Sequence, residues 1–360
     1  MQVGIIGLQS SGKTTLFNAL TGQMASVGDF ASGKEANKAM VKVPDPRLKR
    51  LAEIFEPDKI THAEVQYIDI AGMTGGASTE KSEAAYVAAI RLVDELAQVV
   101  RVFENDSVPH PEGSIDPVRD IDSANSELIF NDLIVADNNV NRLEKSMRVA
   151  KSDENKKRWE LLRRSCEALE ADTFLGDIDF TSDELKMLSG YGFLTLKPQL
   201  YILNIGESQI ADCQLPEKLE EHLKPRKSSA VAICAKIAME IAQLDEEDRD
   251  EFRSTLGIKS SALDTVITES YRLLGQISFL TGGEKEVRAW TIKKGASAQE
   301  AAGAIHSDFQ RGFIKAEIVS YDELDKSGSW SDAKKGGKLR LEGKDYTVKD
   351  GDVILFRFNV

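Results

Sequence analysis

The most specific motif of the chain is Gly7-Leu8-Gln9-Ser10-Ser11-Gly12-Lys13-Thr14, close to its start. It fits the pattern G-x-x-x-x-G-K-[ST], in which backbone N–H groups surround a phosphate. Residues 2–6 before it form a short apolar run typical of a strand, and residues 15–20 after it have the composition of a helix ended by Gly22. A strand, a glycine-rich loop and a helix N-terminus in this order make an anion site. The sequence therefore predicts a nucleotide-binding domain.

Two residues of this loop are expected to carry chemistry. Lys13 should reach the terminal phosphates and act in catalysis, and the hydroxyl of Thr14 should coordinate Mg²⁺. A chance glycine-rich turn is the alternative, which the agreement of strand, spacing and helix disfavours. The expected nucleotide contacts in the loop are Gln9, Ser10, Ser11, Gly12, Lys13, Thr14 and Thr15.

The bulk composition limits the class of protein. With 360 residues, of which 41% are hydrophobic, the chain should hold two or three domains with ordinary cores. The first strand begins at residue 2, so we expect no signal peptide, and no apolar run approaches the roughly 20 residues of a membrane span. The three cysteines and four histidines are scattered. This dispersal argues against a disulfide framework or a zinc site and favours the reducing cytoplasm.

The net charge of −13 is unevenly distributed. Residues 281–360 hold 14 Lys and Arg against 13 Asp and Glu, so the acidity belongs to the first 280 residues. A wholly acidic surface repels nucleic acid, so contact with RNA would need a local basic face. We expect no DNA or membrane partner, and a monomer, because no long heptad seam is present.

Strands and helices alternate over the first 120 residues or so and again after residue 196. This is the pattern of a parallel α/β sheet. The expected elements are strands at 3–6, 64–70, 98–103, 199–204 and 230–234 and a helix at 82–96.

Between these two parts, apolar residues recur at steps of three and four from 128 to 169 among many charges. This amphipathic pattern predicts a helical hairpin with its polar turn at 151–157. A solvated helical pair and a partner-binding coiled coil both fit it. Thr181 then resembles a helix N-cap.

The last 80 residues form a separate unit in the sequence pattern. Strands are expected at 287–292, 315–321, 338–341 and 353–358, and a helix at 297–306 with Ser297 as its N-cap. One sheet packed on one helix predicts a β-grasp domain. The predicted fold is thus α/β, with a P-loop nucleotide-binding G domain (1–120 and 196–277), an inserted helical coiled-coil domain (121–195) and the β-grasp domain (278–360).

Asp69-Ile70-Ala71-Gly72 ends the second strong strand, which should place Asp69 near Lys13. In a nucleotide switch such an aspartate holds Mg²⁺ and the glycine N–H senses the γ-phosphate, so Gly72 is an expected contact. The next position, often a glutamine that orients water, is Met73, so hydrolysis should be slow or should use another group. His110 is the candidate; a surface loop histidine is the alternative.

Asn204-Ile205-Gly206-Glu207 follows a buried strand, where guanine-specific proteins place Asn-Lys-x-Asp. The longer carboxylate of Glu207 cannot keep the bidentate geometry that guanine needs, so adenine becomes credible. Asn204 and Glu207 are therefore expected at the base. Ala235, after the next strand, is a candidate for a supporting backbone N–H.

These residues resemble the YchF family, the Obg-like ATPases of the P-loop GTPase class, over nearly the whole length. The signatures are Val-Pro-Asp-Pro-Arg-Leu at 43–48, the Asp-Ile-Ala-Gly motif at 69–72, and the stretches 102–106, 285–291, 340–346 and 356–360.

The resemblance implies a C-terminal β-grasp unit of the TGS type, ATP in preference to GTP, slow Mg²⁺-dependent hydrolysis, and association with ribosomes or ribosomal RNA. It places the family's loop histidine at His110, its hydrophobic replacement for glutamine at Met73, and a backbone contact to the base at Ile205. It also matches Asn204 and Glu207 to the family's Asn-x-x-Glu motif.

Two departures from the family pattern stand out. The family loop usually reads Asn-Val-Gly-Lys-Ser, whereas residues 10–14 keep the hydroxyl as Thr14. The first switch normally carries Pro-Phe-x-Thr-Ile, whereas here the Mg²⁺-binding threonine falls near Gly33. Ser32 is the expected substitute, and without it switch closure and hydrolysis would weaken.

Three other functions stay open at this point. The altered first switch and Met73 fit a nucleotide sensor that barely hydrolyses. A GTP-preferring GTPase would follow if other residues build the base pocket. A small-molecule kinase would need an arginine lid, for which Arg163 and Arg164 are the nearest candidates, and the C-terminal unit disfavours it.

Overall fold

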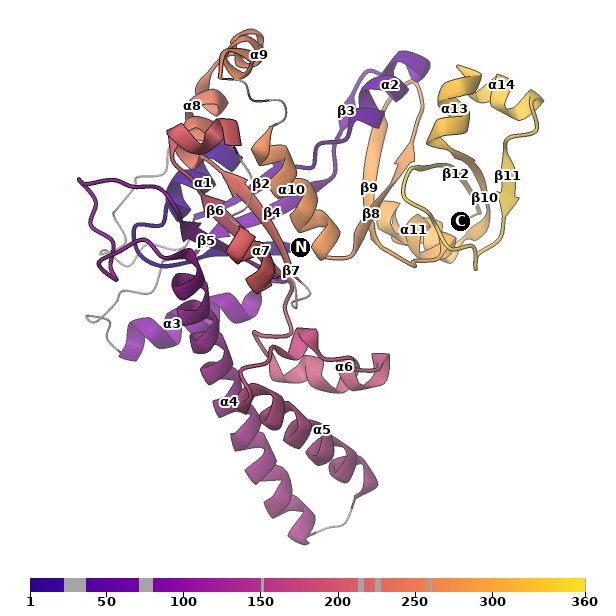
Figure 1. Ribbon diagram of the computed structural model, residues 1–360. Coiled ribbons are helices and arrows are strands. Elements are labelled where there is room, and N and C mark those ends of the chain that lie inside the picture. The colour runs from indigo at the N-terminus through magenta and orange to yellow at the C-terminus, as the bar shows by residue number, and fades with distance from the viewer. Residues whose placement is uncertain are drawn as a thin grey trace. The chain divides into compact units, whose positions relative to one another are not determined.

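The computed structural model describes residues 1–22, 37–70, 80–149, 152–212, 217–223, 228–256, 258 and 261–359 (Figure 1). It divides into two compact units. The first contains residues 1–39 and 66–266, and the second contains residues 40–65 and 267–360. Among the described residues, no helix has both the length and the apolar character required to cross a bilayer.

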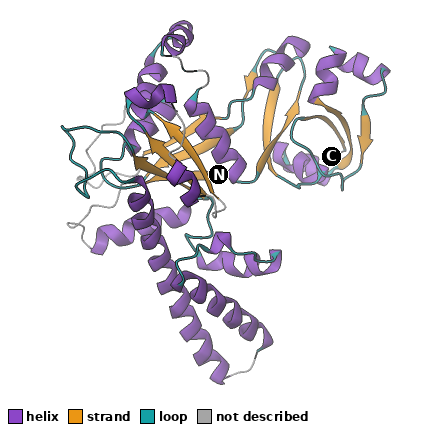
Figure 2. Ribbon diagram, viewed as in Figure 1, coloured by secondary structure: helices purple, strands orange, loops and turns teal. Residues whose placement is uncertain are grey.

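The first unit is built on a six-stranded sheet of order β2-β4-β1-β5-β6-β7. Its strands β4, β1, β5, β6 and β7 are mutually parallel. Helices flank the sheet (Figure 2), so central strands such as β5 and β6 are buried along their whole length. The strands are β1 (Gln2–Ile6), β2 (Asn37–Lys42), β4 (Glu64–Asp69), β5 (Glu95–Arg101), β6 (Gln199–Asn204) and β7 (Ser228–Ile233).

Helices connect these strands as the alternating pattern predicts. They are α1 (Lys13–Thr21), α3 (Glu80–Leu92), α4 (Pro117–Val149), α5 (Asp153–Glu170), α6 (Ser182–Leu188), α7 (Glu217–Leu223), α8 (Ala235–Gln243) and α9 (Glu246–Thr255), and α10 (Ala262–Leu273) begins in this unit and ends in the other.

The strands predicted near residues 3, 64, 98, 199 and 230 are confirmed, but one boundary was wrong. The helix expected at 82–96 ends at Leu92, and β5 begins at Glu95 instead of residue 98. Leu96 is fully buried and pairs with Gly4 of β1, so sheet pairing overrides the helical pattern there. Val102 and Phe103 lie beyond the end of β5.

A helical arm, formed by α4 and α5, lies between β5 and β6 in the chain (Figure 1). The predicted hairpin is confirmed, with a shorter turn than expected because α5 already begins at Asp153, with Ser152 as its N-cap. The Nε1–H of Trp159 donates to Glu144 Oε1 at 3.1 Å and links the two helices. Thr181 makes the predicted cap as part of a capping box on α6.

The base of the arm is fastened to the loop before β6. Asp132 of α4 is fully buried, and its carboxylate accepts hydrogen bonds from Leu194 N at 2.9 Å and from Thr195 N and Thr195 Oγ1, both at 2.7 Å. Lys197 donates to the carbonyls of Arg91, at 3.0 Å, and Val93, at the end of α3. Polar contacts therefore tie α4, α3 and the loop before β6 together.

The second unit contains a six-stranded sheet of order β11-β10-β12-β8-β9-β3. Ser297 forms a capping box with Glu300 at the start of α11, which confirms the predicted cap. The unit holds more elements than predicted, including β8 and three short helices. Its elements are β3 (Ile60–Thr61), β8 (Gln276–Thr281), β9 (Val287–Lys293), β10 (Phe313–Ser320), β11 (Arg340–Glu342), β12 (Asp352–Phe358), α2 (Pro46–Phe55), α11 (Ala298–Ile305), α12 (Ser307–Arg311), α13 (Tyr321–Ser327) and α14 (Trp330–Lys335).

Residues 40–65 group with the second unit, whereas the sequence pattern places them in the nucleotide-binding domain. Asp45 caps α2, and Arg47 bonds both Asp45 and Asp350 at 2.8 Å. Arg50 bonds Asp325 at 2.6 Å. The Val-Pro-Asp-Pro-Arg signature therefore has a structural role in this unit, one that needs partners some 300 positions away.

Candidate nucleotide-binding site

The carboxyl ends of the parallel strands bring the predicted site residues to one edge of the sheet. The glycine loop follows β1, Asp69 ends β4, Asn204 ends β6, and Cys234 follows β7. β1 lies between β4 and β5 in the sheet, so the loop sits where the strand order reverses. Ligands of open α/β sheets bind at such a point.

The backbone of the loop explains its glycines. Gly7 has φ +139°, and a Cβ there would lie 2.3 Å from Val99 O. Gly12 has φ +99°, and a Cβ there would lie 2.2 Å from Asn204 Nδ2. Ser10 also has a positive φ of 62°. Only glycine tolerates the close approaches at positions 7 and 12, so the loop shape follows directly from the sequence.

Lys13 lies at the first turn of α1 with 7% of its surface exposed. Its Nζ donates to Gly7 O at 3.0 Å and to Leu8 O at 2.7 Å, so the side chain folds back onto the loop. Burial lowers the pKa of Lys13 to about 8, and the nearby Asp69 opposes this shift. A phosphate group in the loop would compete with the two carbonyls for this cation.

Thr14 and Asp69 meet beside Lys13. Thr14 Oγ1 donates to Asp69 Oδ2 at 2.9 Å, and Asp69 is fully buried. Its other oxygen, Oδ1, is buried without a hydrogen-bond partner in the described part of the chain. Burial raises the pKa of Asp69, although the Thr14 bond and the charge of Lys13 oppose this.

This pair fits Mg²⁺, which takes oxygen ligands and is usually held by one or two protein groups together with phosphates and water. Thr14 and Asp69 would hold the cation, and it would neutralise charge on the phosphates. Within the described ranges, no three His, Cys, Asp or Glu side chains form a metal cage. Residues Ser32 and Gly72, and Met73, lie outside the described residues.

Asn204 connects the phosphate loop to the far side of the site. Its Nδ2 donates to Ser11 O at 2.9 Å, and its Oδ1 accepts from Ala235 N at 3.0 Å. Asn204 is 5% exposed. The side chain therefore couples the loop after β1 to the start of α8.

The backbone N–H groups of the two residues expected to contact the base through their backbone are already bonded inside the protein. Ala235 N donates to Asn204, and Ile205 N donates to Ile233 O at 2.9 Å. The Ala235 N–H group, which was predicted to contact the base, therefore donates to Asn204 in this structure. A backbone contact between Ile205 and the base would have to use the Ile205 carbonyl.

Glu207 and Lys236 face one another at the mouth of the site. Lys236 Nζ lies 2.6 Å from Glu207 Oε1, and both side chains are more than half exposed. An exposed pair of this kind contributes at most about 1 kcal/mol to stability. It nevertheless places one acceptor group and one donor group beside the cleft.

A cleft of about 1280 Å³ joins the loop to these residues. This space exceeds the size of typical small-ligand pockets. Gln9, Ser10, Gly12, Lys13, Thr14 and Thr15 line it, and so do Asn204, Ile205 and Glu207. Sequence reasoning missed the walls contributed by Phe103, Lys236 and Met239. The family signature at 102–106 was the available signal for Phe103.

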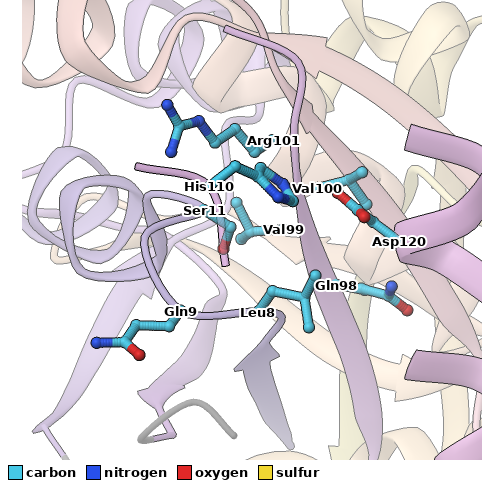
Figure 3. Close-up of a pocket in the computed structure, with 9 residues that line it drawn as sticks. All are labelled: Leu8, Gln9, Ser11, Gln98, Val99, Val100, Arg101, His110 and Asp120. Atoms are coloured by element: carbon cyan, nitrogen blue, oxygen red, sulfur yellow. Dashed lines mark ion pairs between the residues drawn. The ribbon is translucent and has the colours of Figure 1, made fainter. Parts of the chain in front are cut away.

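His110 lies elsewhere, behind the phosphate loop (Figure 3). It lines a water-sized cavity together with Leu8 and Ser11, and Ser11 itself is buried there. His110 Nε2 lies 3.0 Å from Asp120 Oδ2, and the His110 side chain is 5% exposed. The structure thus brings His110 close to the loop backbone but not into the lining of the large cleft.

The arginines considered for a kinase lid belong to the helical arm. Arg164 bonds Glu184 at 2.9 Å and Asp179 O at 3.1 Å, and its guanidinium lies 4.7 Å from the centre of the Phe180 ring. Arg163 lies 3.9 Å from Glu167. Neither arginine lines the cleft.

A parallel sheet with a phosphate loop after its first strand, and a carboxylate facing the loop threonine, defines a P-loop nucleotide-binding protein of the GTPase class. Comparison with family models agrees with this class. A model described as "50S ribosome-binding GTPase" matches residues 2–138. The model of the YchF-GTPase C-terminal domain, described as "Protein of unknown function (DUF933)", matches residues 276–359.

The chain belongs to the YchF family. It is 41% identical over 365 residues to the ribosome-binding ATPase YchF of Bacillus subtilis (strain 168), with 100% of each chain covered. It is 42% identical over 361 residues to the protein of that name from Pasteurella multocida (strain Pm70), with 99% of each covered. The solved structure of the Schizosaccharomyces pombe YchF GTPase is similar, with a TM-score of 0.87 and 28% identity over 99% of this chain and 97% of that one. These findings confirm the predicted family and fold class.

Proposed function

We propose that this protein is a slow, Mg²⁺-dependent ATPase switch that prefers ATP to GTP and associates with ribosomes in the cytoplasm. The relatives named ribosome-binding ATPases support this proposal at about 40% identity over the full length. The roles assigned to Lys13, Thr14, Asp69 and His110 are part of it. We also propose that Ser32 coordinates Mg²⁺ and that the Gly72 N–H contacts the γ-phosphate.

We assign the preference for ATP to the backbone N–H groups of Ile205 and Ala235, which are already hydrogen-bonded within the protein. Guanine presents an acceptor, O6, where adenine presents the N6 amino donor. The two N–H groups that would serve O6 are engaged at 2.9 and 3.0 Å with Ile233 O and Asn204 Oδ1. The Ile205 carbonyl would instead accept from N6 of adenine. Glu207 and Lys236 offer an acceptor and a donor beside the cleft, and the longer carboxylate of Glu207 does not keep the bidentate geometry that guanine needs.

The first test is calorimetric titration of nucleotide-free protein with ATP and GTP, each with Mg²⁺. We expect ATP to bind at least about tenfold more tightly, because guanine would leave buried polar groups unpaired. Glu207→Asp restores the carboxylate length of guanine-specific proteins and should narrow the difference. Equal or tighter binding of GTP by the wild type would refute the assignment of the amides.

The affinity for ATP should also fall as the pH rises. In the free protein Lys13 loses its proton above its pKa of about 8, whereas a bound phosphate favours the charged ammonium. Binding at high pH must then take up a proton, so we expect about tenfold weaker binding at pH 9 than at pH 7. Titrations at pH 7, 8 and 9 and constant salt measure this. The affinity of the Lys13→Ala variant for ATP should not fall between pH 7 and pH 9. A wild-type affinity that does not change with pH would contradict the role given to Lys13.

A nucleotide sensor with little hydrolysis is the second candidate, favoured by Met73 and by the absence of His110 from the cleft lining. Single-turnover hydrolysis with and without ribosomes separates the two. Stimulation by ribosomes supports the switch, and turnover that stays at background in both conditions supports the sensor.

The proposal includes a division among three parts, with nucleotide binding in 1–120 and 196–277, an inserted helical domain in 121–195 and a β-grasp domain of the TGS type in 278–360. The arm shares one hydrophobic core with α3, in which Ile90 and Val93 join Leu128 and Leu162. Ile68 and Ile70, the neighbours of Asp69 in the chain, belong to the same core, so a change at Asp69 has a packed route to the arm.

A further inference from the structure

We infer that Asp120 is a positioning residue that holds His110 in a resting place outside the nucleotide cleft, so that ATP hydrolysis requires release of this contact. The inference rests on the proposed ATPase function and on His110 as its catalytic histidine. It adds a residue at the first turn of the helical arm to the machinery of the site.

Both ring nitrogens of His110 are engaged. Nδ1 accepts a hydrogen bond from Glu112 N at 3.1 Å, so the proton of the neutral ring sits on Nε2. Nε2 in turn faces Asp120 Oδ2 at 3.0 Å. An imidazole that orients or deprotonates water needs an unoccupied nitrogen. In this arrangement His110 offers none.

The surroundings of the ring exclude a substrate. The His110 and Asp120 side chains are 5% and 4% exposed. The cavity beside them has a volume of about 10 Å³, which admits about one water molecule. Figure 3 shows the imidazole between the phosphate loop and α4, directed toward Asp120. His110 must therefore leave this place before it can meet a nucleotide.

A second set of contacts fastens the same loop. Arg119 Nη2 donates to Asp120 Oδ1 at 2.7 Å and to Ser114 O at 2.6 Å, and Arg119 Nη1 donates to Ser114 Oγ at 3.0 Å. Arg119 thus orients the Asp120 carboxylate and also holds the loop at Ser114, four residues beyond His110. We name His110, Ser114, Arg119 and Asp120 the histidine latch.

The position of the histidine latch suggests what opens it. Arg119 and Asp120 lie in the first turn of α4, the long helix of the arm. A partner that shifts the arm would move Asp120 relative to the sheet and free His110. The latch therefore gives the arm a direct effect on hydrolysis, in addition to the core it shares with α3.

The test uses graded variants of Asp120 in the full-length protein. Asp120→Ala removes the contact and Asp120→Asn retains its volume but not its charge. We expect kcat for ATP, measured without ribosomes, to rise about tenfold in Asp120→Ala, because a hydrogen bond to a charged group is lost, and less in Asp120→Asn. KM should change less than about twofold, because His110 does not line the cleft.

Asp122 provides a matched control on the same helix. It makes a more exposed contact of the same type, with His222 Nε2 2.8 Å from Asp122 Oδ1, and lines neither cavity beside the phosphate loop. Asp122→Asn should leave kcat unchanged. Adding His110→Ala to either Asp120 variant should abolish the gain, since the latch acts only through that ring.

A second readout does not depend on turnover. Diethyl pyrocarbonate acylates accessible imidazoles, and the chain has four histidines that mass spectrometry can distinguish. We expect slow modification of His110 in the wild type and faster modification in Asp120→Asn, with His306, which is 61% exposed, as the internal standard. Asp120→Asn keeps this test valid if Asp120→Ala misfolds.

The outcomes separate the latch from the proposed function. A fall in kcat for both Asp120 variants would show that Asp120 assists the reaction, and this result would overturn the latch. Unchanged kcat together with unchanged acylation of His110 would show that Asp120 neither assists the reaction nor restrains His110, and this result would overturn the latch as well. If wild type and Lys13→Ala have the same background turnover, the ATPase proposal itself fails. The acylation result then still decides whether Asp120 confines His110.

Discussion

We expect Lys13→Ala to lower the rate of ATP hydrolysis by about a hundred- to a thousandfold. The Lys13 ammonium is buried at the first turn of α1, where the loop carbonyls of Gly7 and Leu8 hold it at 3.0 and 2.7 Å. When phosphates enter the loop, this is the charge placed to stabilise them, and charge stabilisation supplies most of the catalysis in phosphoryl transfer. Single-turnover assays with saturating ATP and Mg²⁺ measure the loss.

The loss should be specific to this lysine. Lys186→Ala, on an exposed site of α6, should leave turnover unchanged. The nucleotide-free Lys13→Ala protein should not unfold at a lower temperature, because burial disfavours the charged lysine, as its lowered pKa shows. Equal turnover by Lys13→Ala and wild type would mean that the measured hydrolysis does not come from this site.

The local parts of the site were predictable because their geometry is encoded by neighbours in the chain. The phosphate loop needs only the spacing of Gly7, Gly12 and Lys13 between a strand and a helix. Asp69 and Asn204 were placed correctly at strand ends, since parallel strands bring their carboxyl ends to one edge.

The parts that no local pattern specifies depend on contacts distant in sequence. Whether the amides of Ile205 and Ala235 are available depends on the packing of β6, β7 and α8, which no local pattern reports. The His110 contact with Asp120 joins a loop to the first turn of a helix, and no local pattern reports which carboxylate a loop histidine meets. Residues 40–65 left the expected domain because Arg47 and Arg50 have partners at Asp350 and Asp325.

The second large effect concerns the base of the arm. We expect Asp132→Ala to lower the free energy of unfolding of the first unit by about 3 kcal/mol. The fully buried carboxylate accepts the N–H groups of Leu194 and Thr195 at 2.9 and 2.7 Å, and the hydroxyl of Thr195 at 2.7 Å. Alanine would leave two buried N–H donors without a partner, and it would leave a cavity.

The chain offers a local probe for this measurement. Of its three tryptophans, only Trp159 lies in the first unit, on α5 of the arm. In a Trp290→Phe and Trp330→Phe background, the fluorescence of Trp159 during urea unfolding reports the first unit without the second. This avoids treating two units as a single two-state transition.

Further variants separate the contribution of the Asp132 hydrogen bonds to stability from the effect of an alanine substitution elsewhere on the same helix. Thr195→Val removes only the hydroxyl donor and should cost about 1 kcal/mol. Asp137→Ala, at an exposed position on the same helix, should change stability by less than about 0.5 kcal/mol. If Asp132→Ala costs no more than Asp137→Ala, the carboxylate does not fasten the arm, and the packed core shared with α3 holds it alone. A loss near 3 kcal/mol that also slows ribosome-stimulated hydrolysis would show that the fastened arm base transmits the partner's effect to the nucleotide site.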